Sequence, residues 1–137
     1  MKLKLLAAAL LAWALATAPA AAQSPHWPDY NTLQTQMFFG LFSADGNGVS
    51  EQEWATFVRE VVTPRFPDGL TVLNAYGQGT STPAATGVES ETTKMLIVVH
   101  ENTNDAQSKL AEIKAEYRTR FGQKGVFHVD FPARIVE

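Results

Sequence analysis

The sequence predicts an α+β domain with the ferredoxin-like order β-α-β-β-α-β, in which a four-stranded antiparallel sheet carries two helices on one face. Runs of β-forming residues and two stretches with helical apolar spacing follow one another along the chain in that order. Each β-α-β half is expected to be right-handed, which places both helices on the same side of the sheet. The other face is then solvated, covered by a long loop, or used in an interface.

The chain begins with a pattern typical of a secretory signal peptide, residues 1–22. Lys2 and Lys4 flank the start, an apolar run extends over residues 5–16, and three alanines at 20–22 provide a cleavage point. The apolar run is short for a membrane span, and an uncleaved anchor is the alternative. We therefore expect an exported protein, in the periplasm or outside the cell. Residues 23–32 form a polar lead-in to a single domain over residues 33–137.

The composition excludes several classes of function. The chain has 11 basic and 14 acidic residues, and loss of Lys2 and Lys4 with the signal peptide leaves a net charge of −5. An acidic domain without a run of lysine or arginine is a poor partner for nucleic acids or anionic membranes. The absence of cysteine excludes disulfides, zinc–thiolate sites and thiol catalysis.

The first strand is predicted over residues 33–42, which are rich in β-forming side chains. Ser50 begins the first helix, because its hydroxyl can cap the chain and Glu53 completes a capping box. Pro64 ends this helix, since it lacks an amide hydrogen and restricts the residue before it. The helix has one apolar stripe at spacings of three and four, made of Trp54, Phe57, Val58, Val61 and Val62.

The second half of the domain starts with a turn at residues 67–69, Pro-Asp-Gly, and a strand over 71–78. Residues 79–93 are polar and rich in threonine, serine and glycine, which predicts a long hairpin arm or a mobile loop. Residues 94–100 are apolar and predict the third strand. The alternating residues 126–131 predict the fourth.

The second helix is predicted between the third and fourth strands. Asn104 is expected to cap its start, and Gly122 is expected to end it. Its apolar stripe consists of Leu110, Ile113, Tyr117 and Phe121.

Residues 43–54, SADGNGVSEQEW, look like part of a calcium-binding loop. With Gly48 at the sixth position, Asp45 and Asn47 match two ligand positions, but Trp54 stands where a bidentate glutamate is required. Asp-Gly and Asn-Gly pairs are typical of turns. We interpret the segment as a turn into the capped helix and predict no metal site.

Two histidines are candidates for a site. In the predicted sheet, the strands of His100 and His128 flank the first strand, so their backbones lie about 9–10 Å apart. Either both contact one ligand, or each is an edge-of-strand histidine satisfied by solvent. Strand alternation groups His128 with Asp130. We expect this pair to share the helix-free face with the polar residues of the second strand, as a binding site, a solvated surface or an interface.

Four segments carry a resemblance to a known family: MFFGLF, EQEWATFVREVVTPRFPDGLTVLNAYGQ, ETTKMLIVVHE and EYRTRFGQKGVFHVDF. Together they resemble the DUF3574 family of short exported bacterial proteins over residues 37–131, and residues 62–72 are the most specific part. The resemblance implies a compact α+β domain behind a signal peptide or lipoprotein signal, and it implies no established activity. Gly79 departs from the aromatic residue expected there, residues 80–92 are unusually rich in threonine and alanine, and the lipoprotein cysteine of some relatives is absent.

The residues that match the family pattern, together with the fourth-strand histidine, give the candidate ligand-binding set. These candidates are Arg65, Asp68, Tyr76, Gln78, Lys94, His100 and His128. For Arg65 and Asp68 the alternative is that they pair with each other and brace their loop. No catalytic residue and no cofactor are predicted.

Three functions fit the sequence. The first is an exported domain that binds a small ligand or an envelope protein with the polar sheet face and residues 63–69. The second is an enzyme in which Tyr76, His100 and Arg65 participate. The third is a structural homodimer through the open sheet face.

Overall fold

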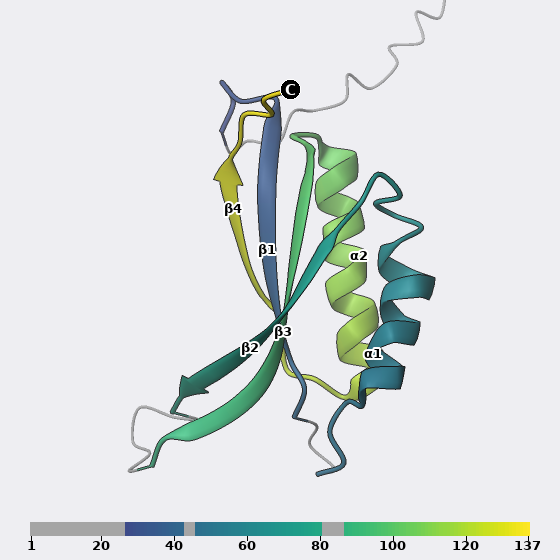
Figure 1. Cartoon of the computed structure of the whole chain (residues 1–137), viewed down its shortest axis with the longest axis vertical. Helices are drawn as coiled ribbons and strands as arrows, with labels where there is room; N and C mark the ends of the chain where they lie inside the picture. Colours follow the sequence, from purple (N-terminus) through teal and green to yellow (C-terminus); the bar gives the residue numbers. More distant parts are fainter. Residues whose placement is uncertain (1–26, 43–45, 81–86) are drawn as a thin grey trace, which may run out of the picture.

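The computed structural model describes residues 27–42, 46–80 and 87–137, and the predicted signal peptide lies outside them. The elements are β1 (Thr32–Gly40), α1 (Glu51–Phe57), η1 (Val58–Val62), β2 (Thr71–Gly79), β3 (Glu89–Glu101), α2 (Asn104–Phe121) and β4 (Phe127–Pro132). The four strands form one antiparallel sheet in the order β2-β3-β1-β4. Both helices lie on the same side of this sheet (Figure 1). The predicted ferredoxin-like fold is confirmed.

The central strand β1 shows why one face of the sheet is the core face. Its side chains alternate between buried and half-buried, as the period of two in a strand requires. Leu33, Thr35, Met37 and Phe39 are fully buried and face the helices. The only polar member of this set is Thr35, which therefore needs a hydrogen-bonding partner inside the protein.

The first helical segment begins as the sequence predicts. Ser50 accepts a hydrogen bond from the backbone N–H of Glu53, and the Glu53 carboxylate accepts from the Ser50 backbone N–H, which completes the capping box. Gly46 and Gly48, with φ of 79° and 73°, form the turn before it, while Asp45 lies outside the described residues. The last five residues, η1, are π-helical, a change of pitch that the apolar spacing did not predict.

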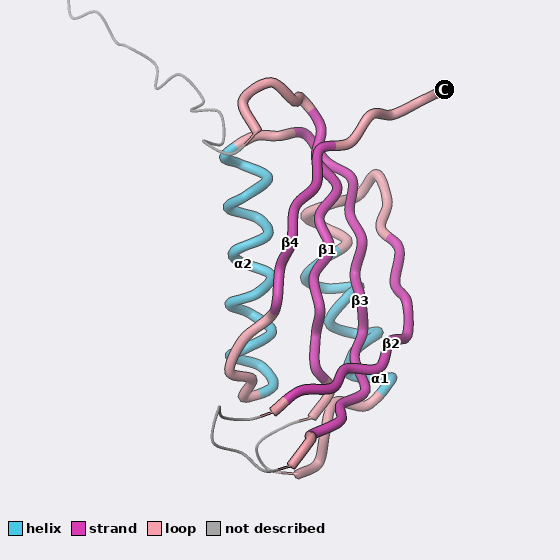
Figure 2. Tube along the Cα trace, turned by 90° about the vertical axis from the view of Figure 1, so that its left-hand side faces the viewer, coloured by secondary structure: helices cyan, strands magenta, loops and turns pink. Residues whose placement is uncertain are grey.

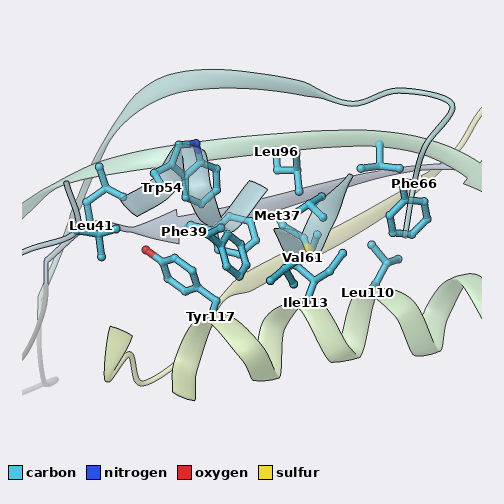
Figure 3. Close-up of a cluster of buried hydrophobic side chains, with 14 of the residues drawn as sticks. Met37, Phe39, Leu41, Trp54, Val61, Phe66, Leu96, Leu110, Ile113 and Tyr117 are labelled. Carbon is cyan, nitrogen blue, oxygen red and sulfur yellow. The ribbon is translucent and has the colours of Figure 1, made fainter. Parts of the chain in front are cut away.

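The second helix, α2, starts one residue earlier than its predicted cap requires. Thr103, not Asn104, is the capping residue, because its side-chain oxygen accepts a hydrogen bond from the Ala106 N–H. Gly122 ends the helix with φ of 63°, as predicted. Figure 3 shows Tyr117, Ile113 and Leu110 pointing from α2 into the core.

An aromatic cluster holds the sheet and the helices together. The Phe39 ring lies 4.8 Å from Tyr117 and 5.1 Å from Trp54, measured between ring centroids (Figure 3). Phe57 packs on all three rings. Each of these side chains is nearly or fully buried. Burial of one such ring contributes about 1.5–3 kcal/mol to stability, so this cluster carries a large part of the core.

The predicted arm over residues 79–93 is more regular than its composition indicates. β2 extends to Gly79 and β3 begins at Glu89, and Gly79 pairs with Glu89. The first residue of the segment and its last five residues therefore belong to paired strands. Residues 81–86 lie outside the described residues. Threonine fits a paired strand as well as a loop, which explains why the composition gave the wrong boundary.

The prediction that the polar strand residues share the helix-free face is wrong. His128 and Asp130 of β4 turn toward α2, where Lys114 and Gln107 bind them. Asn74 of β2 also faces the helix side, because its side chain accepts a hydrogen bond from the buried Lys94. The helix-free face instead carries the apolar side chains of β4; Figure 2 shows the four strands side by side in the order β4, β1, β3, β2.

Neither helix in the described part of the chain is long and apolar enough to cross a membrane.

Candidate functional site

The candidate site is a cavity of about 280 Å³ between the loop at residues 65–69, the end of β3 and the first turns of α2. It brings together three of the predicted residues, Arg65, Asp68 and His100. Its wall is completed by Phe66, Pro67, Gly69, Val99, Glu101, Thr103, Asp105, Ala106 and Lys109. This volume is slightly below the range of about 300–1,000 Å³ typical of ligand pockets, so only a small ligand would fit.

The loop is fixed in place by the two residues that follow Pro64. Phe66 is 8% exposed and anchors the loop in the core, with its ring centroid 5.8 Å from that of His100. Arg65 donates to the carbonyl oxygen of Val61 at 2.7 Å and pairs with Glu112 of α2 at 3.1 Å. The predicted alternative that Arg65 braces the loop by pairing with Asp68 is therefore wrong: the brace is to α2.

Asp68 is exposed at the tip of this loop. It takes part in none of the hydrogen bonds and ion pairs found among the described residues. Gly69 follows with φ of 137°, a conformation that glycine adopts easily and other residues rarely do. The turn therefore presents the Asp68 carboxylate at the mouth of the cavity, where a ligand can reach it without breaking an internal contact.

His100 lies at the inner end of the cavity and is 8% exposed. Its Nδ1 lies 2.7 Å from the carbonyl oxygen of Glu101, and its Nε2 lies 2.8 Å from the hydroxyl of Thr35. The Thr35 hydroxyl in turn donates to the carboxylate of Asp130. Because both ring nitrogens are engaged, the imidazole has one fixed orientation.

The other predicted histidine is joined to the same chain of hydrogen bonds. His128 Nε2 lies 2.7 Å from Oδ1 of Asp130, and its Nδ1 lies 3.0 Å from the Lys114 ammonium. An ammonium only donates, so Nδ1 of His128 accepts and Nε2 donates to Asp130. Gln107 donates to the second oxygen of Asp130 at 3.0 Å. Asp130 is thus the acceptor at the centre of the network.

The hydrogen bonds also define the direction of the two contacts of His100. The single hydrogen of the Thr35 hydroxyl goes to Asp130, so this hydroxyl accepts from Nε2 of His100. The Glu101 carbonyl also only accepts, so Nδ1 must donate to it. His100 is therefore held between the Thr35 hydroxyl and the Glu101 carbonyl, and Thr35 links it to Asp130.

The ionised state of Asp130 follows from its surroundings. Burial alone would raise the pKa of this carboxyl, but hydrogen bonds from Thr35, His128 and Gln107 and the nearby His128 outweigh it. The pKa of Asp130 is therefore below its usual value. The negative charge at this position is a stable feature of the folded protein.

The remaining predicted residues lie elsewhere. Lys94 is 3% exposed and binds Glu51 at 2.6 Å and Asn74 at 2.6 Å, which ties β3 to the start of α1 and to β2. It is six residues from His100 along β3, about 20 Å. Lys94 is therefore a structural residue and does not line the cavity.

Tyr76 and Gln78 lie farther out, on the arm formed by β2 and β3. Tyr76 is 68% exposed and donates to Ser90 at 2.5 Å, and Gln78 lines a wider hollow of about 640 Å³. Tyr76 pairs with Thr92, eight residues from His100 along β3, or about 26 Å. The three residues expected to act together in an enzyme, Tyr76, His100 and Arg65, are thus not brought together.

Sequence reasoning missed Thr35, Gln107 and Lys114, which complete the polar network. A signal for Thr35 was available, because it is the one hydroxyl in an alternating buried set of β1. Gln107 and Lys114 gave no signal, since polar residues on a helix are ordinarily solvated. Their role depends on the packing of α2 against β4.

The comparisons with known proteins identify the family and the fold. The family model described as "Protein of unknown function (DUF3574)" matches residues 34–136, and the chain belongs to this family. No curated protein matches the chain.

Two solved structures of a phage SAM lyase have a similar fold. The structure in complex with S-methyl-5'-thioadenosine has a TM-score of 0.58 and 15% sequence identity, over 75% of this chain and 82% of that chain. The apo structure has a TM-score of 0.52 at 15% identity, over 77% of this chain and 92% of that chain. At this identity the similarity concerns the fold alone.

Proposed function

We propose that this member of the DUF3574 family is an exported domain that binds a small polar ligand in the cavity beside residues 65–69. The observation that carries the proposal is the convergence of Arg65, Asp68 and His100, from a loop and a strand end, on one cavity. The pattern at residues 1–22 supports export.

The charges around the cavity favour a ligand that has both a cationic and an anionic or hydrogen-bond-accepting group. Asp68 and Glu101 offer carboxylates at the rim, while Lys109 and Arg65 offer cationic groups. Lys109 already pairs with Asp105 at 2.7 Å, and Arg65 with Glu112. The carboxylate of Asp68 is therefore available to an ammonium group of a ligand, whereas Lys109 and Arg65 would have to leave their present partners to bind an anionic group. Small molecules that carry an ammonium group, such as amino acids, fit this arrangement through that group.

Thermal unfolding in the presence of small molecules tests the proposal. A panel of amino acids, sugars and cell-envelope fragments should contain a compound that raises Tm. At 100 times its Kd a ligand stabilises the native state by about 2.7 kcal/mol, which corresponds to a shift on the order of 10 °C for a domain of this size.

A pair of matched variants locates the site. Asp68→Asn should abolish the shift without changing the unliganded Tm, because the Asp68 side chain is exposed and lies at the cavity mouth. Asp29→Asn makes the same chemical change at an exposed residue outside the cavity and should leave the shift intact. A panel that moves nothing, or a shift that survives Asp68→Asn, contradicts the proposal.

The second candidate is an enzyme, favoured by the fold similarity to the phage SAM lyase and by the orientation of His100 through Thr35 and Asp130. S-methyl-5'-thioadenosine and SAM therefore belong in the same panel. Turnover of SAM that is lost in His100→Asn, with folding retained, would establish this candidate. Absence of turnover in the folded wild type removes it.

A further inference from the structure

The helix-free face of the sheet carries a contiguous uncharged patch. Three rows of side chains cross β3, β1 and β4 in register: Val99–Gln34–Phe131, Ile97–Gln36–Val129 and Met95–Phe38–Phe127. Seven of these nine residues are apolar, and the other two are glutamines. Leu73 of β2, opposite Met95, extends the patch. We name these nine residues the open-face patch.

Three apolar side chains of this patch are exposed, and the other six residues of the patch are half-buried. Phe127 is 68% exposed, Val99 46% and Phe131 45%, and the rings of Phe38 and Phe127 lie 5.8 Å apart. A monomeric soluble protein rarely leaves a contiguous apolar surface of this kind uncovered, and such surfaces mark interaction sites. Among the described residues, no helix or loop covers it, since α1 and α2 both lie on the opposite side (Figure 1).

We propose that a second copy of this chain packs on the open-face patch. The patch contains no charge, and the nearest carboxylates on β3, Glu91 and Glu101, lie beyond its two ends. Two copies of an acidic chain can therefore bring these faces together around a two-fold axis without opposing like charges within the nine residues.

The polar part of the patch has the same self-complementary character. Gln34 and Gln36 carry amides that both donate and accept hydrogen bonds, so each can pair with a glutamine of the other copy. A membrane or nucleic acid would require cations on this face, and the nine residues include none. Two sheets packed face to face would bury the aromatic side chains of both copies.

Sedimentation velocity on the purified protein, over a range of micromolar concentrations, tests the proposal. We expect a concentration-dependent monomer–dimer equilibrium. In Phe127→Lys, each copy loses one buried ring, and each ring is worth about 10- to 100-fold in the equilibrium constant. The dimer Kd should therefore rise at least about 100-fold.

The control is Val136→Lys, which adds the same charge at a residue that is 72% exposed and lies outside the patch. It should leave the Kd within about threefold of wild type, as expected for a surface charge. Val99→Lys repeats the test from β3, and thermal unfolding by circular dichroism checks that each variant folds.

Three results would overturn the proposal. One is a wild-type protein that is monomeric at every concentration. The open-face patch would then be solvated or covered by residues of the chain outside the described ranges. Another is a dimer that Phe127→Lys and Val99→Lys leave unchanged, because it would use a different surface. The third is a dimer that Val136→Lys weakens as much as Phe127→Lys does.

Discussion

The hydroxyl of Thr35 connects the two halves of the buried polar network, so Thr35→Val is the most informative single change. Thr35 is fully buried, and valine has nearly the same shape. The substitution removes the acceptor for Nε2 of His100 and one donor to Asp130, while His128 and Gln107 still bind that carboxylate. The effect should therefore come from hydrogen bonding and charge, with little change in packing.

The expected loss in the free energy of unfolding is about 2–4 kcal/mol at pH 7. A hydrogen bond to a charged group is worth about 1.5–3 kcal/mol, and a buried ring nitrogen without its partner adds about 1 kcal/mol or more. The extra methyl group of valine returns up to about 0.8 kcal/mol. The variant should still fold, since domains of this size have about 5–15 kcal/mol of stability.

Urea unfolding monitored by tryptophan fluorescence measures this loss, because Trp54 is 4% exposed and reports on the core. The ionised state of Asp130, whose pKa is below its usual value, gives stability that is present above the unfolded-state pKa of about 3.9. This stability is lost as the pH falls through the lower folded-state pKa. The difference between wild type and Thr35→Val should therefore be largest near pH 7 and shrink below pH 4.

Thr35→Ser is the matched control, because it keeps the hydroxyl and removes only a methyl group. It should lose about 1 kcal/mol at every pH. If Thr35→Val costs less than about 0.5 kcal/mol at pH 7, or if its cost is the same at pH 7 and below pH 4, the hydroxyl does not couple His100 to Asp130 as described.

Two further predictions concern other buried polar groups. Glu51→Gln should cost about 1–3 kcal/mol of unfolding free energy, because it leaves the ammonium of Lys94, whose side chain is 4% exposed, without its carboxylate. Lys94→Met should cost less, because the Glu51 side chain is 76% exposed and its charge returns to solvent. Equal losses of the two variants in urea unfolding would contradict this asymmetry. Tyr117→Phe should cost about 1 kcal/mol, because Tyr117 donates to the carbonyl oxygen of Gly40 at 2.7 Å. Burial and the charge of Glu91 raise the pKa of Tyr117. The stability of the wild type should therefore fall as the pH rises above about 10, where the unfolded chain loses this proton first, and Tyr117→Phe should weaken that fall. An unchanged pH profile in the variant would contradict the raised pKa of Tyr117.

The fold could be predicted from the sequence because local patterns and chain order agree. The capping box at Ser50, the apolar stripe of α2 and the glycine at 122 each define an element by short-range chemistry. The right-handedness of each β-α-β unit then leaves few arrangements of the sheet. The π-helical segment η1, which follows α1, was not predictable in this way, since its hydrogen-bond shift leaves the spacing of apolar residues almost unchanged.

The candidate site was predictable only in part. The resemblance to the family placed Asp68 and His100 in the candidate set, and the fold brings them to one cavity. Lys94 was misassigned because a buried lysine is rare, and only the structure shows that Glu51 and Asn74 receive its charge. Residues from distant segments that satisfy one another by hydrogen bonding leave no pattern in the local sequence.

The orientation of β4 explains both the network and the exposed apolar face. Alternation alone groups Phe127, Val129 and Phe131, and hydrophobicity would turn them toward the core. The register with β1 instead places Asp130 opposite Thr35 and His128 opposite Met37, on the helix side. A buried threonine hydroxyl requires a partner, and α2 offers Gln107 and Lys114 to the same residues. Since the strand has only two faces, satisfying its polar residues internally exposes its phenylalanines, and an interface with a second copy would then bury them.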